Sequence, residues 1–128
     1  SATQNEINGK DAQNLLKNGV FLISEGANMP STPEAVHQFL ENKILYGPGK
    51  AANAGGVAVS ALEMAQNSMR LSWSREEVDT KLKSIMANIH QTALDASDEY
   101  DHKGNYVMGA NIAGFLKVVN SMIDQGVV

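Results

Sequence analysis

The sequence predicts an incomplete α/β fold that is mostly helical. Three features predict it: two short apolar runs bounded by glycine, an amphipathic helical pattern before each run, and long helical patterns after residue 53. The 128 residues, 43% of them hydrophobic and 19% charged, suffice for one domain or a part of one. Aromatic residues make up only 5%, which is low for an all-β protein.

The first helix and strand are expected within the first 23 residues. Asn8 or Asp11 can cap a helix that runs through Lys17, where Asn18-Gly19 ends it. Residues 20–23, Val-Phe-Leu-Ile, form an unbroken apolar run. Its length and its flanking glycines predict a strand that is buried on both faces, as in parallel sheets.

A second helix and strand follow after a loop of a few residues. Ser31 or Thr32 begins the helix, with Pro33 near its first position. Residues 43–46 are expected to form the second strand, which residues 47–49, Gly-Pro-Gly, close. Alternating helices and strands with short connections are typical of a doubly wound sheet with right-handed crossovers.

Two short parallel strands cannot bury both faces and both edges of an apolar run, so we expect further strands beside them. Residues 1–53 are therefore predicted to be partial Rossmann-like βα units. The fold predicted for the chain is α/β, the C-terminal part of a Rossmann-like (doubly wound) nucleotide-binding domain with about two strands and three C-terminal helices.

Residues 54–128 are predicted to be helical. Ser74 and Glu77 show the spacing of a capping box at the start of the middle helix. Small residues at 109, 110, 113 and 114 are expected to allow close helix contact. The three helices are expected over residues 54 to about 71, 74 to about 96, and about 107 to 124, with an exposed loop over 95–105.

Composition excludes several classes of function. The net charge of -4 argues against nucleic-acid binding, and the absence of cysteine excludes disulfides and thiol chemistry. We expect no membrane span, because no apolar run approaches about 20 residues, and a cytoplasmic setting. Neither a P-loop nor a GxGxxG motif occurs, and the histidines show no spacing for a metal. The three histidines are His37, His90 and His102.

Three loops are candidates for ligand binding. Residues 24–30 and 47–53 leave the carboxyl ends of the predicted strands, where open sheets bind ligands, and residues 2–5 would form a similar loop after a preceding strand. Each contains an asparagine, whose amide both donates and accepts, as a carboxamide or a ribose diol requires. The alternative is that each asparagine only stabilises a turn.

The helix after Asn53 has two glycines in its first turn, which lower helix stability and suggest a close approach to a ligand or neighbour. Asn53, Val57, Ser60 and Met64 lie along one face of it. A hydroxyl at position 60 can bind a carboxylate there. Alternatively, Ser60 is only a small residue that permits tight helix packing.

Five motifs together resemble the C-terminal portion of bacterial hexameric glutamate dehydrogenases. They occur in the family's order and spacing over essentially the whole chain, with one departure at Ser1, where relatives often carry cysteine. The motifs are Ala2-Thr3-Gln4-Asn5-Glu6, Glu25-Gly26-Ala27-Asn28-Met29-Pro30, residues 47–57, residues 60–67 and Gly109-Ala110-Asn111-Ile112-Ala113-Gly114-Phe115.

The resemblance implies an enzyme that interconverts L-glutamate with 2-oxoglutarate and ammonia, with NAD or NADP as cofactor. It implies that Asn28 bonds the nicotinamide ribose and Asn53 the carboxamide. Ala2, Thr3 and Gln4 are implied to line the nicotinamide site. Only the nicotinamide end of the cofactor is expected to contact this segment.

The resemblance further implies that Val57 forms part of the glutamate pocket and that Ser60 bonds the side-chain carboxylate. It also implies that residues 54–128 link back toward a substrate domain. The family's catalytic lysine and aspartate precede this segment, so we expect no catalytic residue and no metal here, and an inactive isolated chain. Its expected partners are the remainder of the same enzyme and, in the intact protein, a homo-hexamer. The alternatives are a related leucine, phenylalanine or valine dehydrogenase and a free-standing helical interaction module.

Overall fold

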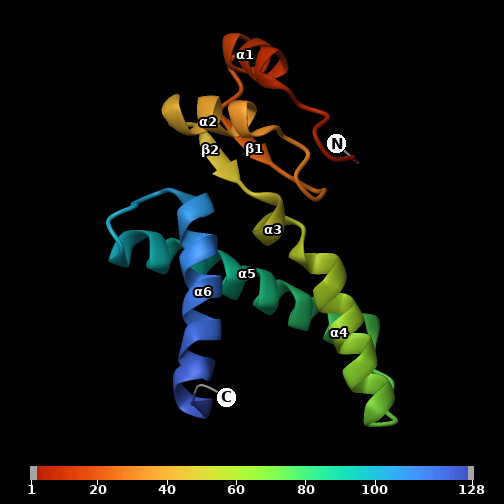
Figure 1. Ribbon diagram of the computed structural model, residues 1–128. Coiled ribbons are helices and arrows are strands. Elements are labelled where there is room, and N and C mark those ends of the chain that lie inside the picture. The colour runs from red at the N-terminus through yellow and green to blue at the C-terminus, as the bar shows by residue number, and fades with distance from the viewer. Residues whose placement is uncertain (1–2, 127–128) are drawn as a thin grey trace.

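The fold is a small α/β unit followed by a layer of long helices (Figure 1). A computed structural model describes residues 3–126. Ala2, one of the residues expected at the nicotinamide site, therefore lies outside the described residues. In chain order the elements are α1 (Gly9–Lys17), β1 (Leu22–Ser24), α2 (Pro33–Glu41), β2 (Leu45–Gly47), α3 (Gly49–Ala52), α4 (Ala54–Ser68), α5 (Arg75–Glu99) and α6 (Tyr106–Gln125).

The predicted helix caps are confirmed. Asn8 caps α1, and the carboxylate of Asp11 accepts the Asn8 amide in return. The Thr32 hydroxyl caps α2 at the amide of Ala35. Ser74 and Glu77 form the expected capping box at the start of α5. These caps use side chains within three residues of the helix start, so they form wherever the local sequence allows them.

The sheet has two parallel strands, β1 and β2, in which Leu22 pairs with Leu45 and Ser24 with Gly47. Both strands begin two residues later than expected. The expectation that the first strand is buried on both faces is wrong for this chain, because Phe21 is 75% exposed and Leu22 48% exposed. The described elements cover only one face of the sheet fully.

That covered face forms the core. Ala12 of α1 and Ala35 and Phe39 of α2 are completely buried against Tyr46 of β2, which is 5% exposed. The rings of Phe39 and Tyr46 are 5.8 Å apart. Val107 at the start of α6 also packs against this cluster, so the last helix contacts the α/β unit.

Helix α5 continues three residues beyond its expected end, so the following loop covers only residues 100–105. The reason is packing against α6. Ala93, Ala96 and Ser97 are buried, while the acidic residues of this segment, Asp95, Asp98 and Glu99, stay exposed. The acidic residues at 95, 98 and 99 predict a loop, but the small residues beside them pack against α6 and keep the segment helical.

The helix crossing depends on Gly109. A Cβ at this position would lie 1.9 Å from the carbonyl oxygen of Ala93, so only glycine permits the observed approach of α6 to α5. The expectation of close helix contact is thus confirmed at Gly109. It is wrong at Gly114, where a Cβ would meet nothing within 4 Å.

Between the sheet and the long helices lies a single turn, α3, in place of the loop expected over residues 47–53. Pro48 precedes it, and the amide of Asn53 donates to the carbonyl of Gly49 at 2.9 Å. Helix α4 begins at once after Asn53 and ends at Ser68, three residues earlier than expected. The turn directs the chain from the end of β2 into α4 (Figure 1).

Helix α6 has the length and composition of a membrane span. It has 20 residues, and an 18-residue window within it has a mean hydropathy of 1.2 and is 6% buried. Asn111, Lys117 and Asn120 interrupt its apolar residues, so it contains no unbroken apolar run of that length. A single such helix is weak evidence for a membrane segment. Its apolar side chains that lie in solvent are Phe115, Val118, Met122 and Ile123.

Candidate functional site

Hydrogen bonds join the three candidate loops to one another. The amide of Asn5 donates to the carbonyl of Met29 at 2.9 Å, which fixes the first segment beside the loop after β1. Asn53 Nδ2 donates to Asn28 Oδ1 at 2.7 Å, which joins the loop after β1 to the end of α3. The three segments therefore meet at the carboxyl ends of the two parallel strands, the edge where open α/β sheets bind ligands.

The bond between Asn28 and Asn53 determines which of their atoms remain for a ligand. Within the described residues it uses the Asn28 oxygen and the Asn53 nitrogen. The Asn28 nitrogen then offers a donor and the Asn53 oxygen an acceptor, both at an exposed position. One donor and one acceptor side by side match a ribose hydroxyl and a carboxamide.

The side chain of Asn53 does not only stabilise its own turn. Asn53 stands at the N-cap position of α4, but its side chain makes no capping hydrogen bond. Asn8, Thr32 and Ser74 at other helix starts all do so. The side chain of Asn53 instead reaches across to another loop, which a turn-stabilising asparagine does not need to do.

Val57 and Ser60 lie on the exposed surface of α4 beyond the asparagines. Ser60 is seven residues after Asn53, which places it two turns or about 10 Å along the helix and on the same face. Its hydroxyl donates to the carbonyl of Gly56 at 3.3 Å, a long bond that a stronger acceptor can replace. Val57 is 70% exposed, so this helix face is open.

Tight helix packing does not explain this segment within the described residues. Ser60 is exposed, and a Cβ at Gly56 would meet nothing within 4 Å. At Gly55 a Cβ would make only ordinary contacts, 3.8 Å from both Leu82 and Met86. No part of the described chain approaches closely enough to account for two glycines in the first turn of α4.

Thr3 and Gln4 are exposed in a turn before α1. Asn5 follows with a φ of 58°, a left-handed conformation that asparagine tolerates better than most residues. Its bond to Met29 sets the position of this turn relative to the loop after β1. The structure thus places Thr3 and Gln4 near the candidate loops and gives no side-chain contact from them to Asn28 or Asn53.

Sequence reasoning missed the role of Glu25, which is 6% exposed. Its Oε2 accepts the amide of Gly49 at 2.9 Å, and its Oε1 is buried without a hydrogen-bond partner among residues 3–126. A glutamate that follows a strand is normally exposed to solvent, so no local sequence pattern predicts that Glu25 is buried. A second missed contact joins Lys50 of α3 to Asn111 of α6.

The Tyr46 hydroxyl lies under the loop beside this carboxylate. Burial of the phenol, with the neighbouring Glu25 carboxylate, raises the pKa of Tyr46 well above its usual value near 10, and Ser31 opposes this in part. The Ser31 oxygen is itself buried without a hydrogen-bond partner in the described part of the chain. Tyr46, Glu25 and Ser31 thus form a buried polar cluster next to the loop after β1.

Two of the three histidines contact neighbouring side chains. His37 pairs with Glu41 one turn further along α2 at 3.1 Å. His90 of α5 stacks on Tyr106 of α6, with 5.3 Å between the ring centroids. Among residues 3–126 no group of three or more metal-binding side chains lies together.

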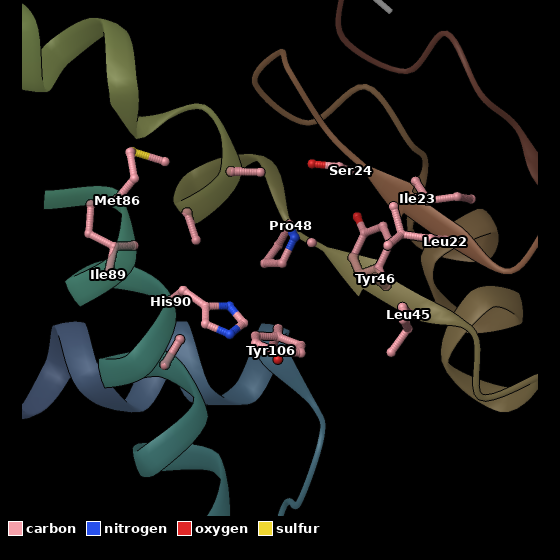
Figure 2. Close-up of a pocket in the computed structure, with 14 residues that line it drawn as sticks. Leu22, Ile23, Ser24, Leu45, Tyr46, Pro48, Met86, Ile89, His90 and Tyr106 are labelled. Carbon is pink, nitrogen blue, oxygen red and sulfur yellow. The ribbon is translucent and has the colours of Figure 1, made fainter. Parts of the chain in front are cut away.

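A groove of about 430 Å³ opens between the sheet and helix α5 (Figure 2). Leu22 and Leu45 face it from the strands, and Met86 and Ile89 from α5. Its lining is mostly apolar, and none of the six described candidate residues, at positions 3, 4, 28, 53, 57 and 60, contributes to it. The groove is therefore separate from the asparagine pair.

Comparison with known proteins identifies the family. The model of the glutamate/leucine/phenylalanine/valine dehydrogenases matches residues 1–126. The glutamate dehydrogenase of Bacteroides thetaiotaomicron is 64% identical over 128 residues, which are 100% of this chain and 29% of that protein. The NAD(P)-specific glutamate dehydrogenase of Xylanibacter ruminicola is 60% identical over 126 residues, which are 98% of this chain and 28% of that protein.

A solved glutamate dehydrogenase from Plasmodium falciparum has the same fold over this segment. Its TM-score is 0.96 at 52% identity, over 99% of this chain and 27% of that one. The predicted α/β class and the resemblance seen in the motifs are confirmed. The chain spans less than a third of the length of these relatives. It belongs to the glutamate/leucine/phenylalanine/valine dehydrogenase family.

Proposed function

We propose that the full polypeptide containing this chain is a glutamate dehydrogenase. It converts L-glutamate, NAD(P)+ and water to 2-oxoglutarate, ammonium, NAD(P)H and a proton, and the reaction is reversible. The observation that carries this proposal is the hydrogen-bonded pair of Asn28 and Asn53 at the carboxyl ends of β1 and β2, in a chain 64% identical to a glutamate dehydrogenase. The cofactor, when bound, supplies the hydride acceptor.

In this proposal the asparagines hold the nicotinamide half of the cofactor. The Asn28 nitrogen donates to a hydroxyl of the nicotinamide ribose, and the Asn53 oxygen accepts from the carboxamide. Because the two side chains bond each other, they keep a fixed spacing before the cofactor arrives. Thr3 and Gln4 line the same site from the neighbouring turn, together with Ala2. The remaining part of the cofactor binds elsewhere in the polypeptide.

The substrate lies along α4. Val57 forms an apolar wall, and the Ser60 hydroxyl exchanges its bond to Gly56 for one to the side-chain carboxylate of glutamate. A hydrogen bond to a charged acceptor is stronger than the 3.3 Å bond it replaces. A site that bonds a polar group of the substrate discriminates strongly against substrates that lack that group.

The catalytic lysine and aspartate lie outside this chain, so the isolated segment is inactive. Residues 1–53 complete a nucleotide-binding domain, and residues 54–128 lead from it toward the substrate domain. Closure of the two domains would bring nicotinamide and substrate together and exclude water. The intact protein acts in the cytoplasm as a homo-hexamer.

Expression of the full polypeptide and of residues 1–128 tests this proposal. Absorbance of the reduced nicotinamide follows glutamate oxidation with NAD+ and with NADP+. We expect turnover by the full polypeptide with at least one cofactor and none by residues 1–128. A full polypeptide that is folded and oxidises glutamate with neither cofactor would contradict the proposal.

The related alternative is a leucine, phenylalanine or valine dehydrogenase, and Ser60 distinguishes the two. In the full polypeptide, Ser60→Ala is expected to lower kcat/KM for glutamate by about tenfold or more, since it removes a hydrogen bond to a charged group. Its kcat/KM for norleucine should change little. Greater activity on norleucine than on glutamate in the unmodified protein favours the alternative.

A further inference from the structure

The loops that follow β1 and β2 are joined by two hydrogen bonds of different kinds. The outer bond, between Asn28 and Asn53, lies at the exposed surface. The inner bond runs from the amide of Gly49 to Glu25 Oε2 at 2.9 Å and is buried. Its acceptor comes from the residue directly after β1, and its donor is the first residue of α3.

The chain connects these bonds closely. Asn28 is three residues after Glu25, and Asn53 is four residues after Gly49. The amide of Asn53 donates to the carbonyl of Gly49 at 2.9 Å, which closes the single turn of α3. The position of Gly49 therefore sets the position of Asn53, and the Glu25 carboxylate fixes Gly49 from the opposite loop.

Contact between the two backbones tightens this arrangement. A Cβ at Gly49 would lie 2.4 Å from the carbonyl oxygen of Ala27 and 3.4 Å from Glu25 Oε2. No other residue type fits there without separating the loops. Glu25 and Gly49 thus form one buried contact between the same two loops that the pair of asparagines joins at the surface.

A glutamate in this position needs an explanation. Burial of a carboxylate is unfavourable unless hydrogen bonds compensate it, and here the Gly49 amide donates to one of its oxygens. The Tyr46 hydroxyl, which is also buried, interacts with the same carboxylate. Without this carboxylate the buried amide of Gly49 would lose its acceptor, so the side chain at position 25 determines how the two loops are joined.

We propose that Glu25 is a positioning residue for the cofactor site, which holds the loop of Asn53 in register with the loop of Asn28. The inference rests on the proposed function and extends it to a residue that touches no ligand. Glu25 acts through Gly49, and its effect appears in the affinity for the nicotinamide cofactor. Binding of glutamate along α4 depends on it much less.

Two variants of the full polypeptide disturb this contact independently. Glu25→Ala removes the acceptor, and Gly49→Ala pushes the loops apart through the Ala27 carbonyl. Glu25→Gln keeps an oxygen that can accept the Gly49 amide and serves as the conservative variant. Glu41→Ala is the matched control, because Glu41 is an exposed glutamate of α2 that pairs with His37 on the same helix.

The measurements are the dissociation constant for NADH or NADPH, the KM for glutamate, and amide hydrogen exchange over residues 25–30 and 48–53. We expect Glu25→Ala and Gly49→Ala to weaken cofactor binding by about tenfold or more and to speed exchange in both loops. The KM for glutamate should change less than about threefold. Glu25→Gln should retain most of the affinity, and Glu41→Ala all of it.

The outcomes separate this inference from the proposed function. Faster exchange with unchanged cofactor affinity overturns the positioning role, as does an equal loss of affinity for cofactor and glutamate. Should Glu25→Ala fail to fold, Gly49→Ala and Glu25→Gln still give opposite expected results. An unmodified protein that binds neither NADH nor NADPH contradicts the proposed function itself, and the positioning role falls with it.

Discussion

Replacement of Gly109 by alanine tests the packing of α6 on α5. A Cβ there would lie 1.9 Å from the Ala93 oxygen, 2.9 Å from its carbonyl carbon and 3.1 Å from the Ser97 Cβ. Most of this surface is backbone, which cannot rotate away. The two helices must therefore separate by at least about 1 Å to reach ordinary contact distances.

The size of the effect follows from two opposing terms. Overpacking costs about 1–3 kcal/mol, and we expect the upper end because the obstacle is a main-chain carbonyl. Alanine in place of glycine in a helix contributes about 1 kcal/mol of stability. Gly114→Ala on the same helix is the matched control, because its Cβ would meet nothing within 4 Å and only the favourable term applies.

Urea unfolding of the 128-residue chain, followed by circular dichroism, measures both variants. Gly114→Ala should be as stable as the unmodified chain or more stable. Gly109→Ala should be less stable than Gly114→Ala by about 2–3 kcal/mol, since both share the same helix propensity gain. Equal free energies of unfolding for the two variants would refute the assignment of this crossing to Gly109.

Two further predictions concern stability. Burial raises the pKa of Tyr46 above 10, so its ionisation leaves the free energy of unfolding unchanged below pH 10. As the pH rises further, ionisation lowers that free energy by at most about 1.4 kcal/mol per pH unit. In equilibrium unfolding, Tyr46→Phe should show a shallower decline above pH 10, and equal slopes for the two proteins would contradict this. Ser74→Ala should cost about 1 kcal/mol through loss of the α5 cap, while Ser72→Ala in the preceding loop should change the free energy of unfolding by less than about 0.5 kcal/mol.

Helix starts were predictable from the sequence because they depend on neighbours in the chain. Asn8, Thr32 and Ser74 cap their helices with atoms only two or three residues away. The end of α5 and the limits of the strands depend on packing between distant segments. Ala93 and Ser97 are helical because α6 covers them, and no local pattern contains that information.

The same distinction applies to the candidate site. Parallel strands place their carboxyl ends together, so the sequence could indicate that the loops of Asn28 and Asn53 meet. It could not indicate that Glu25 turns inward to Gly49, because the contact joins residues 24 positions apart and reverses the usual exposure of glutamate. The contact between Lys50 and Asn111, 61 positions apart, was inaccessible for the same reason.

The roles of Thr3, Gln4, Val57 and Ser60 remain proposals based on the resemblance. The structure adds that Val57 and Ser60 lie on an open helix face and that no described residue packs closely against them. The apolar groove beside α5 and the exposed Leu22 and Leu45 also agree with the short span of this chain relative to its relatives.

The most direct test of the account is the dissociation constant of NADH, or of NADPH, for Asn53→Ala in the full polypeptide. The account predicts a loss of about tenfold or more, because Asn53 both contacts the cofactor and orients Asn28. Asn88→Ala, which removes an exposed asparagine of α5, should leave the constant unchanged. Equal cofactor affinity in the Asn53 variant, the Asn88 variant and the unmodified protein would contradict the central claim.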